Sequence, residues 1–365
     1  MTRTLTPLLA LALMAAACKK ETPAAGGAET PKPAPEAKKG LEAADSNPEV
    51  VAAVKKVLEC EWKRFGFTSK CEAYKSFTTS DLIKQGRADK TLVNMTEDGD
   101  EKVRWIAAGM LRQHGKLYES DPALAGRVVA ALETEKSEMV AERLASAVSE
   151  IDLEGTKLVD KVIGLCKSGT EPVRAALIHH MLFRNRDSKK LYEFVKDAAK
   201  TAESVKVRQA AVRAFWVGTP RDKYGEVCKL WLDVAQTDKS EEVADTALRL
   251  AAQNPGGRCK EDYDAILELA GKKAKAGAVK NADVAYAVQY VHGQKQNASD
   301  VQKKRALSVA ETLLKNEANK DMARSAALRF LAKELPTKAK ALAKKHANDK
   351  SFFVKSAAKR VLEGK

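Results

Sequence analysis

The stretch VRAALIHHM at residues 173–181 decides the fold of this chain, because the same pattern returns many times along it. An apolar residue comes first, a basic residue often second, small or apolar residues fourth and fifth, and apolar residues last. Clear copies are 103–111 (VRWIAAGML), 207–215 (VRQAAVRAF) and 323–331 (ARSAALRFL). Apolar positions at this spacing share one face of a helix. Each copy therefore predicts a helix with one buried face.

The copies recur at intervals typical of a repeat protein. Weaker copies start at Val50, Val140 and Val284, and the clearer ones start at Val103, Val173, Val207, Val243, Ala323 and Val354. From residue 103 onward the separations are 37, 33, 34, 36, 41, 39 and 31 residues. A period of this length, filled by two helices, is the signature of an α-solenoid. We predict about seven to nine helix pairs, separated by breaks such as 218–220 (GTP) and 254–257 (NPGG).

The repeated pattern resembles HEAT-type repeats over roughly residues 100–365. The matching residues include Val173-Arg174, Val207-Arg208 and the paired alanines that follow them. The resemblance implies an all-α superhelix of the HEAT/ARM-like kind. It also implies that the basic residue at the second position bonds an acidic neighbour across the stack. Three copies carry Ala141, Ala244 and Ala285 at that position, so the same bond is not implied there.

The first 17 residues read as a signal peptide. Arg3 is followed by an apolar run, Leu8 to Ala17, that is too short to span a membrane, and then by Cys18. The sequence up to Cys18 resembles a lipobox, which implies cleavage before Cys18 and its lipidation, with palmitate among the acyl groups. Ala15 and Ala17 also fit ordinary signal cleavage at the same bond, so plain secretion is the alternative.

The position after the cysteine bears on location. The lipobox resemblance implies outer-membrane delivery, facing the periplasm, because Lys19 replaces the Asp that retains lipoproteins at the inner membrane. Residues 18–47 are rich in Ala, Pro, Lys, Glu and Gly, which favours a disordered tether behind the lipidated cysteine. We expect N-terminal capping helices at 48–99 and the repeat solenoid at 100–365, with basic C-terminal repeats at 271–365.

Five cysteines remain after Cys18, an odd number for an oxidising compartment. Cys60 and Cys71 lie close in the N-terminal cap, where a bridge is plausible. Cys228 and Cys259 occupy comparable places about one repeat apart, which favours a second bridge. Cys166 reads as a buried helix thiol.

Enzyme chemistry finds no support in the motifs. The sequence contains no HExxH, no GxSxG and no phosphate-binding GxxxxGK[ST]. His179 and His180 are neighbours, and adjacent helical residues point about 100° apart, so we expect them to face different sides and to share no metal. We predict no enzymatic activity, no cofactor and no metal. A resemblance to HEAT-like lyases of pigment proteins lacks any supporting nucleophile.

Charge is the clearest functional signal. Residues 1–270 hold 42 basic and 41 acidic side chains, whereas 271–365 hold 22 basic and 8 acidic, a net charge of +14. Such asymmetry attracts anionic partners. The candidate binding residues are Lys272, Lys273, Lys275, Lys280, Lys303, Lys304, Arg305, Lys344, Lys345, Lys355, Lys359 and Arg360. Few aromatic residues interleave these bases, and the protein is expected to be exported, so we do not expect nucleic acid.

Two functional hypotheses follow. The first is a non-enzymatic, periplasm-facing lipoprotein that binds an envelope protein as a scaffold, because solenoids present extended binding surfaces. The second is a polyanion or membrane-surface binder, which would use the basic C-terminal repeats to bind lipid head groups, lipopolysaccharide or cell wall.

Overall fold

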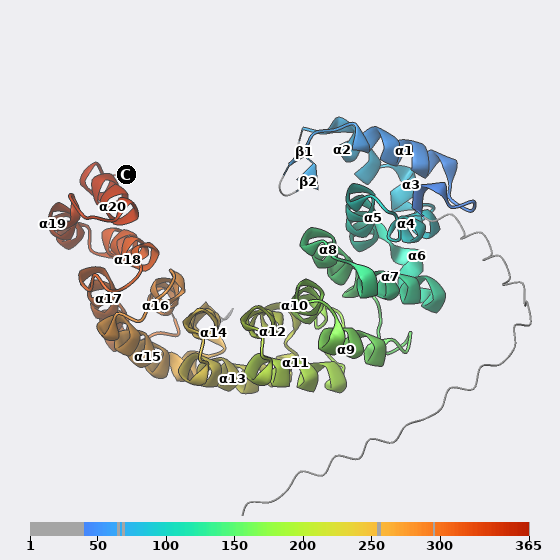
Figure 1. Ribbon diagram of the computed structural model, residues 1–365. Coiled ribbons are helices and arrows are strands. Elements are labelled where there is room, and N and C mark those ends of the chain that lie inside the picture. The colour runs from blue at the N-terminus through green and yellow to red at the C-terminus, as the bar shows by residue number, and fades with distance from the viewer. Residues whose placement is uncertain (1–39, 64–65, 68–69, 254–256, 295, 365) are drawn as a thin grey trace, which may run out of the picture. The chain divides into compact units, whose positions relative to one another are not determined.

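The structure is a computed structural model, and it describes residues 40–63, 66–67, 70–253, 257–294 and 296–364 (Figure 1). Several short elements at the N-terminal end of this part of the chain precede the repeats. These elements are a 3-10 turn (Gly40–Glu42), α1 (Pro48–Leu58), β1 (Trp62–Lys63), β2 (Gly66–Phe67), α2 (Glu72–Thr78) and α3 (Asp81–Lys84). Two further short helices are α4 (Asp89–Met95), which belongs to the first repeat, and α6 (Lys116–Ser120), which follows that repeat. The two strands pair antiparallel, with Trp62 opposite Phe67. The described residues lie in a single unit, Lys38–Lys365.

Eight helix pairs make up the rest of the described chain. The first pair is α4 and α5 (Glu101–His114). The others are α7 (Pro122–Thr134) and α8 (Glu138–Val148), α9 (Val159–Ser168) and α10 (Glu171–His180), α11 (Lys189–Thr201) and α12 (Val205–Gly218), α13 (Tyr224–Thr237) and α14 (Glu241–Gln253), α15 (Tyr263–Ala276) and α16 (Asp283–Gly293), α17 (Asp300–Lys315) and α18 (Asp321–Glu334), and α19 (Pro336–His346) and α20 (Phe352–Leu362).

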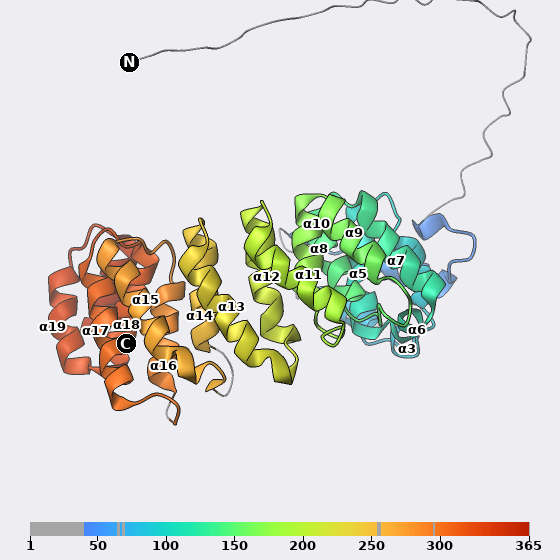
Figure 2. The same cartoon turned by 90° about the horizontal axis from the view of Figure 1, so that it is seen from below.

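The helices form two layers. The second helices pack on one another in the order α5, α8, α10, α12, α14, α16, α18 and α20, and the first helices from α7 to α17 follow one another beside them. Figure 2 views the first-helix layer, in which α9, α11, α13 and α15 succeed one another. This is the HEAT/ARM-like solenoid that the repeat spacing predicts, with a number of pairs inside the predicted range.

The repeated anchors pack between these layers. Val173, Val207 and Val354 are at most 1% exposed, and the alanine pairs Ala210-Ala211 and Ala326-Ala327 are at most 8% exposed. Small side chains at these positions let neighbouring helices approach closely, and the larger anchors fill the space that remains. The apolar and small anchors of the pattern are therefore packing residues.

Polar residues begin the helices where the sequence indicates. The Asp121 carboxylate accepts hydrogen bonds from the backbone N–H groups of Ala123 and Leu124, and Pro122 occupies the first turn of α7. The Ser204 and Ser351 hydroxyls cap α12 and α20 in the same way. Thr170 stands at the N-cap of α10, but its side chain makes no capping bond. These caps satisfy backbone donors that have no partner inside the helix.

Three of the arginines at the second position of the pattern join successive repeats, whereas Arg174 donates to the carbonyl oxygen of Cys166 on the preceding helix. Arg104 lies 2.8 Å from Glu135, and Arg208 lies 2.7 Å from Asp238. Arg324 lies 2.6 Å from Asp349, again across a repeat junction. In each pair the side chains are at most 19% exposed. This is the cross-stack bond implied by the HEAT resemblance.

Two disulfides link segments within the solenoid, at the two pairs that the sequence favours. Cys60 follows α1 and bonds Cys71 at the start of α2, with 5.7 Å between their Cα atoms. Cys228 on α13 bonds Cys259, which precedes α15, with 5.6 Å between their Cα atoms. Cys166 is free and buried, and burial raises the pKa of its thiol. A buried thiol of raised pKa is inert, as expected for a packing residue.

The boundary of the predicted tether needs a correction. Residues 40–47, which the sequence assigns to the tether, contact the first repeats. Leu41 N–H donates to Asp98 at 2.8 Å, and Asn47 N–H donates to Thr91 Oγ1 at 2.7 Å. The predicted signal peptide and residues 18–39 lie outside the described residues. Among the residues described, no helix combines the length and apolar character needed to cross a bilayer.

Candidate anion-binding surface

The predicted basic residues lie on both helical layers. Lys272, Lys273 and Lys275 belong to α15, and Lys303, Lys304 and Arg305 belong to α17. Lys344 and Lys345 lie at the end of α19, Lys280 precedes α16, and Lys355, Lys359 and Arg360 lie on α20. They are therefore distributed over several helices of 271–364 and do not form one cluster.

Lys273 is wrongly assigned to the binding surface. Its side chain is only 10% exposed, and its Nζ atom forms an ion pair with Glu241 and lies 3.1 Å from Oδ1 of Asp245. Burial alone would lower the pKa of Lys273, but the two carboxylates raise it, so the ammonium stays charged. Asp245 is fully buried. Lys273 thus holds a repeat junction together and is not available to a partner.

This ion pair lies at the repeat junction of Ala244, where the pattern has no basic residue and the HEAT resemblance implies no cross-stack bond. At the Arg208 junction the base lies on the second helix, and its acid follows about one repeat later. At the Ala244 junction the order is reversed: Asp245 and Glu241 lie on the second helix, α14, and the base comes from the following helix, α15. The junction has a cross-stack ion pair after all, with the signs exchanged.

The last three helices form a basic groove. A groove of about 1100 Å³ lies between α18, the start of α19 and α20. Its charged lining residues are Arg329, Lys333, Lys340, Lys359, Arg360 and Glu363. We call this groove, with its five bases Arg329, Lys333, Lys340, Lys359 and Arg360, the basic groove. Positive charges that line one concavity reinforce one another, so the groove attracts anions.

The bases of the basic groove are weakly compensated. Lys333 lies 3.7 Å from Glu334 and Lys359 lies 3.9 Å from Glu363, and both lysines are more than 70% exposed. Exposed pairs of this kind contribute little. Arg329, Lys340 and Arg360 have no ion-pair partner in the part of the chain that the structure describes. Their charges are therefore available to a ligand.

Only two of the twelve predicted residues, Lys359 and Arg360, line the groove. Arg329, Lys333 and Lys340 were missed. Arg329 and Lys333 stand four residues apart, which places them on one face of a helix, and that spacing is a signal the sequence offered. Lys340 lies in the basic run 338–345, but nothing in the sequence shows that α19 begins beside α20.

Apolar side chains are exposed on the same last helix. Phe352 and Phe353, in the first turn of α20, are 74% and 49% exposed, and their rings contact each other edge to face. Lys355 follows two residues later and is also exposed. Exposed aromatic rings next to bases are a combination found on surfaces that contact membranes or partner proteins.

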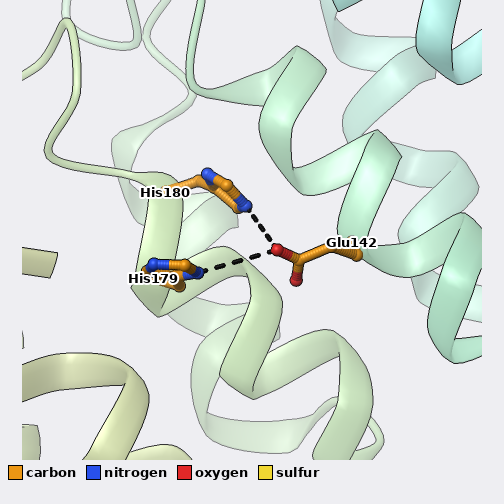
Figure 3. Close-up of side chains that lie close together, drawn as sticks. All are labelled: Glu142, His179 and His180. Atoms are coloured by element: carbon orange, nitrogen blue, oxygen red, sulfur yellow. Dashed lines mark hydrogen bonds and ion pairs between the residues drawn. The ribbon is translucent and has the colours of Figure 1, made fainter. Parts of the chain in front are cut away.

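A second polar cluster lies on the second-helix layer, far along the chain from the groove. His179 and His180 on α10 both face Glu142 on α8 (Figure 3). His180 Nε2 lies 2.7 Å from Oε1 of Glu142, and His179 Nδ1 lies 3.6 Å from the same oxygen. Burial alone would raise the pKa of Glu142, but the two imidazoles lower it well below its usual range.

This geometry contradicts the expectation that the two histidines face different sides. Their ring centroids are 4.6 Å apart with a tilt of 37°. His180 is the last residue of α10. One ring presents Nδ1 and the other Nε2, so side chains that leave the helix in different directions still reach one carboxylate. Adjacent residues of a helix do point in directions about 100° apart at Cβ. Their longer side chains can still bend toward one group, above all at the end of a helix.

No protein-family model and no curated protein matches the chain. Two solved structures are similar in fold. The structure of Kap121p bound to Pho4p has 14% identity and a TM-score of 0.50, and that of Kap121p has 13% identity and a TM-score of 0.50. Each match covers 87% of this chain but 40% of the other. The likeness concerns the fold, and it agrees with the HEAT/ARM-like solenoid.

Proposed function

We propose that this chain is a non-enzymatic, periplasm-facing lipoprotein whose solenoid binds an acidic envelope protein through the basic groove. The observation that carries the proposal is a groove with five bases and one acid among its charged lining residues. The HEAT/ARM-like fold supports a scaffold role, because such solenoids present extended surfaces to proteins. Kap121p, which is similar in fold, has been solved bound to another protein, Pho4p.

A photo-reactive amino acid in place of Lys340 tests the scaffold role. We expect it to cross-link one major envelope protein, and the same substitution at Lys189, an exposed residue of α11, to cross-link none. The cross-link should disappear with Arg329→Glu and Arg360→Glu. A matched control is Lys116→Glu with Lys239→Glu, which changes the charge equally at exposed sites elsewhere. Equal cross-linking in the two double variants would refute the role of the groove.

The membrane anchor is a separate part of the proposal. Cys18 and the apolar run before it support lipidation, and Lys19 supports outer-membrane delivery. Labelling cells with a lipid precursor tests it. We expect label on the wild type and none on Cys18→Ala, and equal labelling of the two would refute the anchor.

A second candidate is binding to an anionic membrane surface. It is favoured by Phe352 and Phe353, which stand exposed beside the bases of α20. An aromatic wedge with adjacent bases binds the lipid interface by both apolar burial and charge. Co-sedimentation with vesicles containing phosphatidylglycerol should then weaken with salt and with Phe352→Ser, whereas binding of a protein in the groove should not depend on vesicles.

A further inference from the structure

Three groups that commonly bind metal ions converge at the junction of α8 and α10 (Figure 3). One ligand atom from each of Glu142, His179 and His180 lies within 4.8 Å of the other two. Across the described residues, with their gaps at 64–65, 68–69, 254–256 and 295, no other group of three meets this criterion. The three side chains are 50%, 36% and 22% exposed, so an ion can reach them from solvent.

The separations suit a tetrahedral ion after small rotations. Zn²⁺ takes imidazole nitrogens and carboxylate oxygens at about 2.0–2.2 Å, so its ligand atoms stand about 3.3–3.6 Å apart. The contact between Glu142 and His179 is already 3.6 Å. The 2.7 Å hydrogen bond between Glu142 and His180 would open slightly as the ion enters between them. Partly exposed side chains make such adjustments at little cost.

The site leaves room for a further ligand. A cavity of about 130 Å³ lies beside it, lined by Glu142, His180, Ser146, Gln113 and the two arginines Arg112 and Arg143. Three protein ligands with one open position is an arrangement known for zinc, with two histidines and one glutamate as a recognised ligand set. The arginines repel cations, although Arg143 is held 3.2 Å over the ring of Trp105.

We propose that Glu142, His179 and His180 form a Zn²⁺ site that joins two neighbouring repeats, with a water as the fourth ligand. The position of Glu142 within its repeat supports a metal ion at this junction. Glu142 follows Ala141, one of the three positions at which the basic residue of the pattern is missing. An ion bound to one side chain of α8 and two of α10 would link this junction as Arg208 and Asp238 link another.

The test is titration of the full chain, without a histidine tag, with Zn²⁺ followed by calorimetry. We expect one equivalent to bind, and Glu142→Gln, His179→Ala and His180→Ala each to weaken binding at least about tenfold. His292→Ala is the matched control, because His292 faces one carboxylate, Glu334, at 3.8 Å. We expect that variant to bind like the wild type.

Co²⁺ spectra separate this site from binding at a thiol. The proposed ligands contain no sulfur, so bound Co²⁺ should show the ligand-field bands of a nitrogen and oxygen site without a thiolate charge-transfer band. Failure of the wild type to bind, equal binding by the three variants, or a thiolate band would each overturn the proposal. Circular dichroism of each variant confirms that a loss of binding is not a loss of fold.

Discussion

The central repeats and the C-terminal repeats share one architecture but treat charge differently. In the central repeats, Lys190 pairs with Asp160, Lys196 with Glu226 and Lys200 with Asp233, each about one repeat away. In the C-terminal repeats, 300–364, some bases are paired, as in Lys338 with Glu311. Others have no ion-pair partner among the described residues: Lys344, Lys345, Lys355 and Arg360.

The central pairs are themselves partly exposed and contribute little to stability. The charge that supports the fold lies in buried pairs such as Arg208 with Asp238. A buried ion pair cannot lose one member without leaving an uncompensated charge in a medium of low dielectric. An exposed lysine can be lost with little change, because water solvates it in both the folded and the unfolded chain. The surplus of bases at 300–364 is therefore free to serve a partner.

The largest effect is expected at Lys273. Lys273→Met keeps the apolar stem but leaves the fully buried Asp245 without its counter-ion. We expect a loss of about 4 kcal/mol in the free energy of unfolding, measured by urea denaturation. The adjacent Lys272→Met is the control, since Lys272 is 72% exposed and should change stability by less than about 0.5 kcal/mol. Similar losses in both variants would contradict a structural role for Lys273.

Arg208→Ala should have the next largest effect. The guanidinium makes two bonds to Asp238, at 2.7 and 3.0 Å, and donates to the carbonyl oxygens of Ala202 and Glu203. We expect a loss of about 3 kcal/mol, because Asp238 is only 4% exposed and would lose its counter-ion. The double variant Arg208→Ala with Asp238→Ala should be less destabilised than the sum of the two single variants, and strict additivity would argue against the pair.

Asp349 predicts a pH dependence within the C-terminal repeats. Burial alone would raise its pKa, but hydrogen bonds from Arg324, Ser351 N–H and His346 lower it below the ordinary 3.8. The carboxylate therefore stabilises the fold fully above that value, and this contribution is lost as the pH falls through the lower folded pKa. Asp349→Asn should cost about 2 kcal/mol at pH 7, and its difference from the wild type should shrink below about pH 4.

The smallest effect on stability is expected in the basic groove. Arg329, Lys340 and Arg360 are exposed, so changing all three to Gln should alter the free energy of unfolding by less than about 1 kcal/mol. The same variant should lose most of the salt-dependent retention on a polyanion column, where Lys116→Gln with Lys189→Gln and Lys239→Gln serves as the control. A large loss of stability would show that these bases support the fold.

Much of the architecture can be read from the sequence. The recurrence of residues such as Val173-Arg174 and Val207-Arg208 predicts paired helices, because the spacing of apolar positions records the period of the helix. The helix caps at Asp121 and Ser204 can also be predicted, because a capping side chain bonds backbone N–H groups only two or three residues away. The basic excess of 271–365 is also visible, since charge is a property of composition.

The tertiary structure alone decided which charged groups are available and which converge. Lys272 and Lys273 are neighbours in the chain, yet one is 72% exposed and the other is 10% exposed beside Asp245. His179 and His180 meet a carboxylate 37 and 38 residues before them. Local periodicity determines the helices, because it acts through hydrogen bonds and contacts within a few residues. The partners of a charged side chain depend on how successive repeats pack, and that depends on the summed shape of many buried side chains.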